Sequence, residues 1–181
     1  MGTPKEPRPA KYFVGLLSPN PALLDQVETD LTPVFGAVES RSETRPWLES
    51  QFYEREMGGG LLRRFIAFAS VHSPGRLAEF KRRTQAIEER HRDGASAGRR
   101  VNIDPGYLDA FKLVLASTKN ASQRIYLDGG IFGEATLLYY NGGFHGLPCT
   151  YRDYLWPETL RFLTSVRASY LAQLRARRQS E

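Results

Sequence analysis

The sequence has very few residues that could form covalent or metal crosslinks. Cys149 is its one cysteine, so no intrachain disulfide can form. This fits a reducing, cytoplasmic compartment better than a secreted scaffold. The three histidines, His72, His91 and His145, lie far apart and share no ligand spacing with Cys149. A zinc site built on cysteine and histidine is therefore not expected.

Long apolar runs are also lacking. No stretch approaches the roughly 18–20 apolar residues that cross a bilayer. Residues 1–10 hold three prolines and mixed charge instead of the apolar core of a signal peptide. We therefore expect a disordered lead over these ten residues and no membrane partner.

Lysines are few, although the chain is basic. Of the 25 basic residues, the lysines are Lys5, Lys11, Lys81, Lys112 and Lys119, and the net charge is +5. The arginines are spread along the chain and do not form one block. This favours a solvated basic surface over an anionic partner, and it predicts nucleic-acid binding that is weak and nonspecific at most.

A phosphate-binding loop of the GxxxxGK[ST] type is missing. The run Gly58-Gly59-Gly60 could let backbone N–H groups approach an anion. However, a phosphate loop needs a helix after its glycines, and residues 61–70 are typical of a strand. The glycine run is therefore predicted to be a turn between two strands, residues 52–57 and 61–70.

What the sequence does contain is enough apolar material for one domain, which we place at residues 11–178. The chain has 181 residues, of which 41% are hydrophobic. Asn20-Pro21 and Ser73-Pro74 each combine a helix cap with a first-turn proline. Residues 11–104 follow the order strand–helix–strand–strand–helix–strand, which predicts a ferredoxin-like split βαβ unit.

The second half is rich in strand-like segments. Residues 111–117, 123–127 and 134–140 carry β-branched or aromatic side chains at strand length, and Asn141-Gly142 is a strong hairpin signal. A last amphipathic helix begins near Pro157. The predicted fold is α+β, with the first sheet continued by additional antiparallel strands and closed by a C-terminal helix.

The most informative short segment is residues 102–106. Asp104-Pro105-Gly106 forms turns readily and directly follows a predicted strand. Asn102 and Asp104 would then lie at a strand end that faces a cleft. Either they contact a ligand or metal, or Asp104 caps the turn while Asn102 pairs with the backbone.

Cations and hydroxyls gather on the next two predicted strands. Lys112 interrupts an apolar run, so it either extends into solvent or has a partner. Arg124 and Tyr126 share one face of their strand by the two-residue period. The group favours a pocket for phosphate or carboxylate, and the alternative is the solvated face of a sheet. The predicted ligand-binding residues are Asn102, Lys112, Ser117, Lys119, Arg124 and Tyr126.

Carboxylates could add proton transfer or metal binding. Asp128 and Glu134 flank a glycine turn, and with Asp104 they could hold Mg²⁺ through oxygen ligands, although acidic residues near turns are ordinary. Glu54 and Glu56 share one face if residues 52–57 form a strand, which would suit paired carboxylate chemistry or a charged edge. The predicted catalytic residues are Asp104 and Glu134, and no dedicated metal site is assigned.

Aromatic residues alternate with charge just before the last helix. Tyr151-Arg152-Asp153-Tyr154 could stack nucleobases. The alternative is an amphipathic lid that packs onto the sheet, and this second interpretation is favoured.

Several short motifs along the chain are each weak alone but specific when taken together. They are Lys11-Tyr12-Phe13-Val14-Gly15-Leu16, Phe52-Tyr53-Glu54-Arg55-Glu56-Met57-Gly58, and residues 102–108, 112–119, 124–127 and 150–154. Together they resemble an uncharacterised prokaryotic family, domain-of-unknown-function family 4416, over about residues 10–175. The resemblance implies a site formed by polar residues at strand ends. Members are sometimes labelled GTP-binding, but Thr118-Lys119-Asn120 lacks the aspartate of a guanine-reading motif.

Three functions are consistent with this sequence. The first is an enzyme or sensor that binds a small phosphorylated or nucleotide-like ligand in a cleft at strand ends. The second is an RNA-binding module without catalysis, and the third is a protein-interaction module. A concave site that joins cations and carboxylates favours the first, a broad surface of one charge sign the second, and a flat apolar patch the third.

Overall fold

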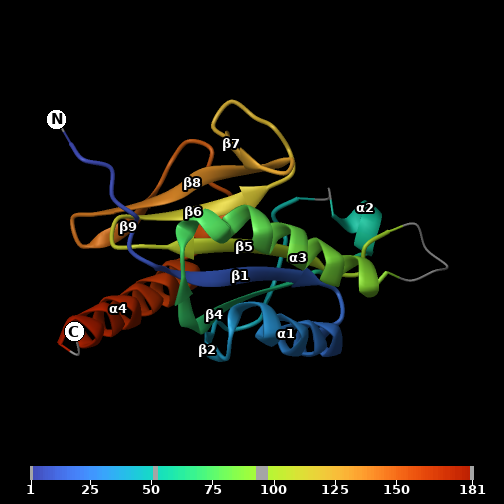
Figure 1. The fold of residues 1–181 in the computed structure, drawn as a ribbon. Coiled ribbons are helices and arrows are strands. Elements are labelled where there is room, and N and C mark those ends of the chain that lie inside the picture. Colours follow the sequence, from blue (N-terminus) through green and yellow to red (C-terminus); the bar gives the residue numbers. More distant parts are fainter. Residues whose placement is uncertain (1, 51–52, 93–97, 180–181) are drawn as a thin grey trace.

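The central strand of the fold is β1 (Ala10–Ser18), whose residues are all buried. The computed structural model describes residues 2–50, 53–92 and 98–179 (Figure 1). Helix α1 (Pro21–Phe35) follows β1, and its cap is the one predicted: Asn20 Oδ1 accepts hydrogen bonds from the backbone N–H groups of Ala22 and Leu23. This strand and helix confirm the opening of the predicted order.

The rest of the first half forms short strands, one long strand and a second long helix. The elements are β2 (Val38–Arg41), β3 (Arg45–Pro46), α2 (Glu54–Met57), β4 (Leu62–His72), η1 (Pro74–Arg76), α3 (Leu77–Arg90) and β5 (Asn102–Leu108). The strand predicted for residues 52–57 is wrong where it is described, because Glu54–Met57 is a helical turn. Phe52 lies outside the described residues.

The second half continues with strands and ends in a long helix, as the sequence predicts. Its elements are β6 (Lys112–Ser117), β7 (Ile125–Asp128), β8 (Ile131–Tyr140), β9 (Gly143–Gly146), η2 (Arg152–Leu155) and α4 (Pro157–Gln179). The β8–β9 hairpin turns at Asn141 and Gly142, which both have positive φ, at 48° and 82°. This backbone explains why an Asn-Gly pair stands there.

The strands form one nine-stranded sheet with the order β2-β4-β1-β5-β6-β8-β7 (Figure 1). Strand β3 also pairs with β4, and β9 with β8. The pairings along this path are antiparallel, and β5 joins the second-half strands to the first through β6. The predicted extension of one sheet by further antiparallel strands is thus confirmed.

The predicted turn at Asp104-Pro105-Gly106 is wrong, because β5 runs through it. Asp104 and Pro105 pair with Gly15 and Val14 of β1, while β6 pairs with β5 only from Gly106 onward. Pro105 therefore has a strand neighbour on one side, which tolerates its missing N–H. Gly106 is needed because a Cβ there would lie 2.6 Å from the carbonyl oxygen of Val114.

Both faces of the sheet are covered. Tyr12, Val14 and Leu16 of β1 pack under α1 and α3, while Phe13, from the alternate set, packs with Phe65 under α4. None of the helices in the described part of the chain combines the length and apolar character needed to span a membrane. The sheet therefore has two buried faces, as a near-continuous apolar β1 requires.

Candidate functional site

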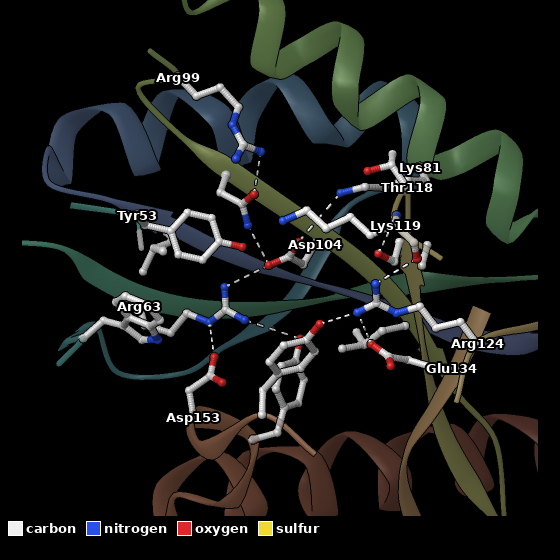
Figure 2. A pocket seen from close by; sticks show the side chains of 18 residues that line it. Tyr53, Arg63, Lys81, Arg99, Asp104, Thr118, Lys119, Arg124, Glu134 and Asp153 are labelled. Atoms are coloured by element: carbon white, nitrogen blue, oxygen red, sulfur yellow. Dashed lines mark hydrogen bonds and ion pairs between the residues drawn. The ribbon is translucent and has the colours of Figure 1, made fainter. Parts of the chain in front are cut away.

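A cavity of about 140 Å³ lies where β4, β5 and β6 meet η2. Charged side chains from β4, α3, β5, β8, η2 and the segments between elements line it (Figure 2). Those lining it are Arg63, Lys81, Arg99, Asp104, Lys119, Arg124, Glu134 and Asp153. Among them the cations outnumber the carboxylates by two.

Asp104, in the middle of β5, connects the cations of the cavity. Its Oδ2 accepts hydrogen bonds from Asn102 Nδ2 at 2.7 Å and Arg63 Nη1 at 3.3 Å. Its Oδ1 lies 3.7 Å from Lys81 Nζ. Asn102 and Asp104 lie side by side because they are two residues apart on one strand.

Arg63, on β4, is the most deeply buried of the cations, with 4% of its surface exposed. Its Nε lies 2.8 Å from Asp153 Oδ2. Burial disfavours the charged guanidinium, yet the carboxylates of Asp153 and Asp104 hold the pKa of Arg63 above its usual range. The guanidinium lies over Gly15, where a Cβ would approach Nη2 to 2.8 Å. A glycine at this point of β1 thus makes room for a buried cation.

Arg124 and Glu134 form a second buried ion pair on the β8 side of the cavity. Arg124 Nη2 lies 3.2 Å from Glu134 Oε1 and donates a hydrogen bond to Tyr151 Oη at 2.6 Å. Gln123 Nε2 donates to Glu134 Oε2 at 2.9 Å. Burial lowers the pKa of Arg124, but the hydrogen bond with Glu134 and the interactions with Tyr151 and the Glu134 charge together outweigh this, so the net pKa is raised. Arg124 Nε is buried and has no hydrogen-bond partner among the described residues.

Arg99 ties the short helix α2 to the cavity. Its Nε and Nη2 each donate to a carboxylate oxygen of Glu56 at 2.8 Å, and Nη1 donates to Asn102 Oδ1 at 2.9 Å. The hydrogen bond from Arg99 lowers the pKa of Glu56. Glu54 and Glu56 therefore lie on a helical turn, not on the strand predicted for them, and Glu56 positions a cation.

A family profile described as "Domain of unknown function (DUF4416)" matches residues 8–170. The chain belongs to the DUF4416 family. The match confirms the resemblance seen in the sequence and includes every residue that lines the cavity. The comparison with curated proteins gives no match, and neither does that with solved structures.

In this DUF4416 chain the fold brings together six of the eight residues predicted for a site. They are Asn102, Asp104, Ser117, Lys119, Arg124 and Glu134. Asn102 and Asp104 reach the cavity from within β5 and not from a turn after it. Figure 2 shows the Lys119 side chain extending into the pocket.

The other two, Lys112 and Tyr126, do not line the cavity. Lys112 begins β6 whereas Ser117 ends it, and its Nζ lies 2.8 Å from Asp109 Oδ2 with 40% of the side chain exposed. Tyr126 lies on β7 at the end of the sheet order, is 59% exposed and packs against Phe132. Arg124 precedes β7, so the two-residue period that was expected to align it with Tyr126 does not apply.

Sequence reasoning missed Arg63, Lys81, Arg99 and Asp153 as site residues. Arg63 had a detectable signal, because it shares the strand face of Phe65 and Ala67 and is therefore a cation at an inward position. Lys81 lies on the buried stripe of α3 and donates to the carbonyl oxygen of Ile103 at 2.8 Å. The favoured lid interpretation of residues 151–154 accommodates Asp153, because η2 buries Asp153 and Tyr154 against the sheet.

The DUF4416 cavity does not present its carboxylates as metal ligands. Within the described residues, no three His, Cys, Asp or Glu side chains lie close enough to hold an ion. Asp128 lies outside the cavity, 3.2 Å from Arg82. The oxygens of Asp104 and Glu134 already accept from cations and amides, so the magnesium set proposed from the sequence is not assembled.

Proposed function

We propose that the cavity between β4, β5 and β6 binds the phosphate or a similar oxyanion group of a small ligand. Among the described residues, five cationic and three carboxylate side chains line it, an excess of two positive charges. Glu56 and Glu88, which pair with Arg99, do not line the cavity. Convergence of fixed cations on one concave space is the observation that supports anion binding.

The volume of the cavity limits the size of the group that it can bind. Drug-sized ligands occupy pockets of about 300–1,000 Å³, whereas this cavity measures about 140 Å³. A phosphate group fits such a space, and a whole nucleotide does not. A nucleotide-like or sugar phosphate ligand would therefore place its phosphate in the cavity and the rest of its structure outside it.

The residues divide into those that meet the anion and those that hold them. Lys119 reaches in from the segment just after β6, and Arg124 lines the cavity beside Glu134. Asp104 and Glu134 accept hydrogen bonds from the cations. Asp104 Oδ2 and both oxygens of Glu134 already accept hydrogen bonds, and Asp104 Oδ1 lies 3.7 Å from Lys81 Nζ. This favours positioning over proton transfer, since a general base needs an oxygen that accepts the substrate's proton.

The concave mixture of both charges favours the small-ligand function over the RNA-binding alternative, which requires a broad surface of one sign.

The proposal also includes the fold of the first half. Helix α1 joins β1 to β2, α3 joins β4 to β5, and the strand order β2-β4-β1-β5 is antiparallel throughout. These features support a ferredoxin-like split βαβ unit. Its strands β4 and β5 contribute Arg63, Asn102 and Asp104 to the cavity.

Two matched lysine variants, one at the start of β6 and one just after it, test the proposed anion binding. Lys119→Met and Lys112→Met remove the same charge, but only Lys119 lines the cavity. A thermal-shift screen with inorganic phosphate, sugar phosphates and nucleotides should raise the Tm of the wild type and of Lys112→Met alike. In Lys119→Met the affinity should fall by about tenfold, as for one lost charge-assisted hydrogen bond.

Two results would contradict the proposal. The first is a wild type whose Tm no phosphate compound raises. The second is a ligand whose binding Lys112→Met weakens as much as Lys119→Met does, because the effect would then follow net charge and not the cavity.

A further inference from the structure

A second cavity, of about 320 Å³, lies on the α4 side of the sheet. The connection between β2 and β3, strand β4 and the first turns of α4 form its walls. The side chains that matter to the argument are Arg45, Phe65, Trp156, Thr159, Arg161 and Phe162. Apart from Arg63, no residue lines both this cavity and the smaller one.

One end of this cavity is suited to an anion. Helix α4 has 23 residues and begins at Pro157, so the backbone N–H groups of Glu158 and Thr159 have no acceptor within the helix. These groups carry the positive end of the helix dipole. A helix N-terminus alone does not make a binding site, and the side chain of Thr159 supplies an independent sign of one.

The side chain of Thr159 faces the cavity and has no hydrogen-bond partner among the described residues. Its surface is 3% exposed and it lines the cavity. In the described part of the chain, no group forms a hydrogen bond with its hydroxyl. The hydroxyl oxygen is not among the fully buried side-chain atoms that lack a partner, so it is open to the cavity. A ligand oxygen in the cavity would satisfy it.

Charged side chains surround the same end. Arg45 Nη2 and Arg161 Nη2 lie 3.1 and 3.9 Å from Glu158 Oε1. Both guanidinium groups are therefore close to the first turn of α4 and are partly neutralised by one carboxylate. An anion that enters must compete with Glu158 for them.

The other end is aromatic. Phe65 and Phe162 stack with their ring centroids 6.5 Å apart at 30°. Trp156 donates its Nε1–H to Glu49 at 2.8 Å, which fixes its ring beside the cavity. Flat aromatic walls favour a flat apolar group in the ligand.

We propose that this cavity binds an aromatic phosphate monoester. The phosphate meets the Thr159 hydroxyl and the first-turn N–H groups of α4, and the ring lies against Trp156 and Phe162. The volume of about 320 Å³ accommodates both parts, as the smaller cavity does not. This site and the oxyanion cavity share the side chain of Arg63 among the described residues, and the proposal for this site does not rest on the function proposed for the other.

Isothermal titration of the full chain with phenyl phosphate tests the proposal, with inorganic phosphate and phenol as partial ligands. Phenyl phosphate should bind more tightly than either. Thr159→Val, which keeps the shape of the side chain, should leave the Tm unchanged or higher, because the hydroxyl has no internal partner. It should weaken phenyl phosphate binding by about tenfold, the loss expected for one hydrogen bond to a charged group.

Glu158→Gln gives a change in the opposite direction, because it releases Arg45 and Arg161 from their shared carboxylate and should tighten binding. Lys119→Met, which weakens only the oxyanion cavity, should leave unchanged the component of phenyl phosphate binding that Thr159→Val weakens. The proposal is overturned if phenyl phosphate does not bind at millimolar concentration, or if Thr159→Val binds it as tightly as the wild type. Loss of binding in Lys119→Met alone would assign the compound to the oxyanion cavity, which supports that function and refutes this second site.

Discussion

The two faces of the sheet are built from the same strands but bury different chemistry. Under α1 and α3, Phe35, Phe68 and Phe80 form an aromatic cluster with the ring of Tyr12. Under α4 and η2, the alternate residues surround Arg63, whose charge is matched by Asp153. An apolar cluster tolerates small adjustments, whereas a buried ion pair requires one geometry. The first face therefore serves stability and the second also fixes the cavity.

The largest expected effect comes from the aromatic face. Phe80 is fully buried, with its ring centroid 4.7 Å from that of Tyr12 and 4.6 Å from that of Phe35. Phe80→Ala should lower the free energy of unfolding by about 3–5 kcal/mol. Urea denaturation measures this loss, and the affinity for a phosphate ligand should not change while the variant is folded. A changed affinity would show that the two faces are not independent.

Arg63→Met should come next, with a loss of about 3 kcal/mol, because it leaves Asp153 buried without its cation. Unlike Phe80→Ala, it should also weaken phosphate binding in the folded protein. The double variant Arg63→Met/Asp153→Asn should regain most of the stability but not the binding. If the double variant is as unstable as Arg63→Met, then the packing of the Arg63 side chain, and not its charge, stabilises this face of the sheet.

The smallest effect concerns an ion pair at the rim. The hydrogen bond from Arg99 lowers the pKa of Glu56 below its ordinary value of 4.5. The contribution of the Glu56–Arg99 pair to the free energy of unfolding is therefore complete above pH 4.5. It is lost as the pH falls through the lower pKa that Glu56 has in the folded protein. Glu56→Gln should cost less than about 1 kcal/mol at neutral pH, as expected for a partly exposed pair. Below the folded pKa, the stability curves of variant and wild type should converge, and parallel curves down to pH 2 would contradict the assignment.

The sequence predicted those parts of the fold that depend on local chemistry. Asn20 and Pro21 mark the start of α1, and the Asn141-Gly142 pair marks the β8–β9 hairpin. The turn predicted at Asp104-Pro105-Gly106 failed because tertiary contacts decide there. Gly106 allows β6 to approach closely, and no local pattern reveals that a strand lies so near.

The sequence predicted which strands contribute to the candidate site, but it did not predict which end of each strand lies at the cavity. Lys112 and Ser117 belong to the same strand, and only Ser117 lies at the end that reaches the cavity. Arg63 and Asp153 are 90 positions apart, so their pairing depends on how η2 folds back over β4. Arg63 stands out in the sequence because it occupies an inward-facing position of its strand, but its partner is known only from the tertiary structure.

Arg63 forms part of the wall of both cavities. An occupant of either one that shifts this guanidinium changes the wall of the other. Such coupling is reciprocal: the factor by which one ligand alters the affinity for a second equals the factor in the reverse direction. The two cavities thus share one side chain, and their coupling free energy follows from the binding constant of one ligand measured with and without a saturating concentration of the other.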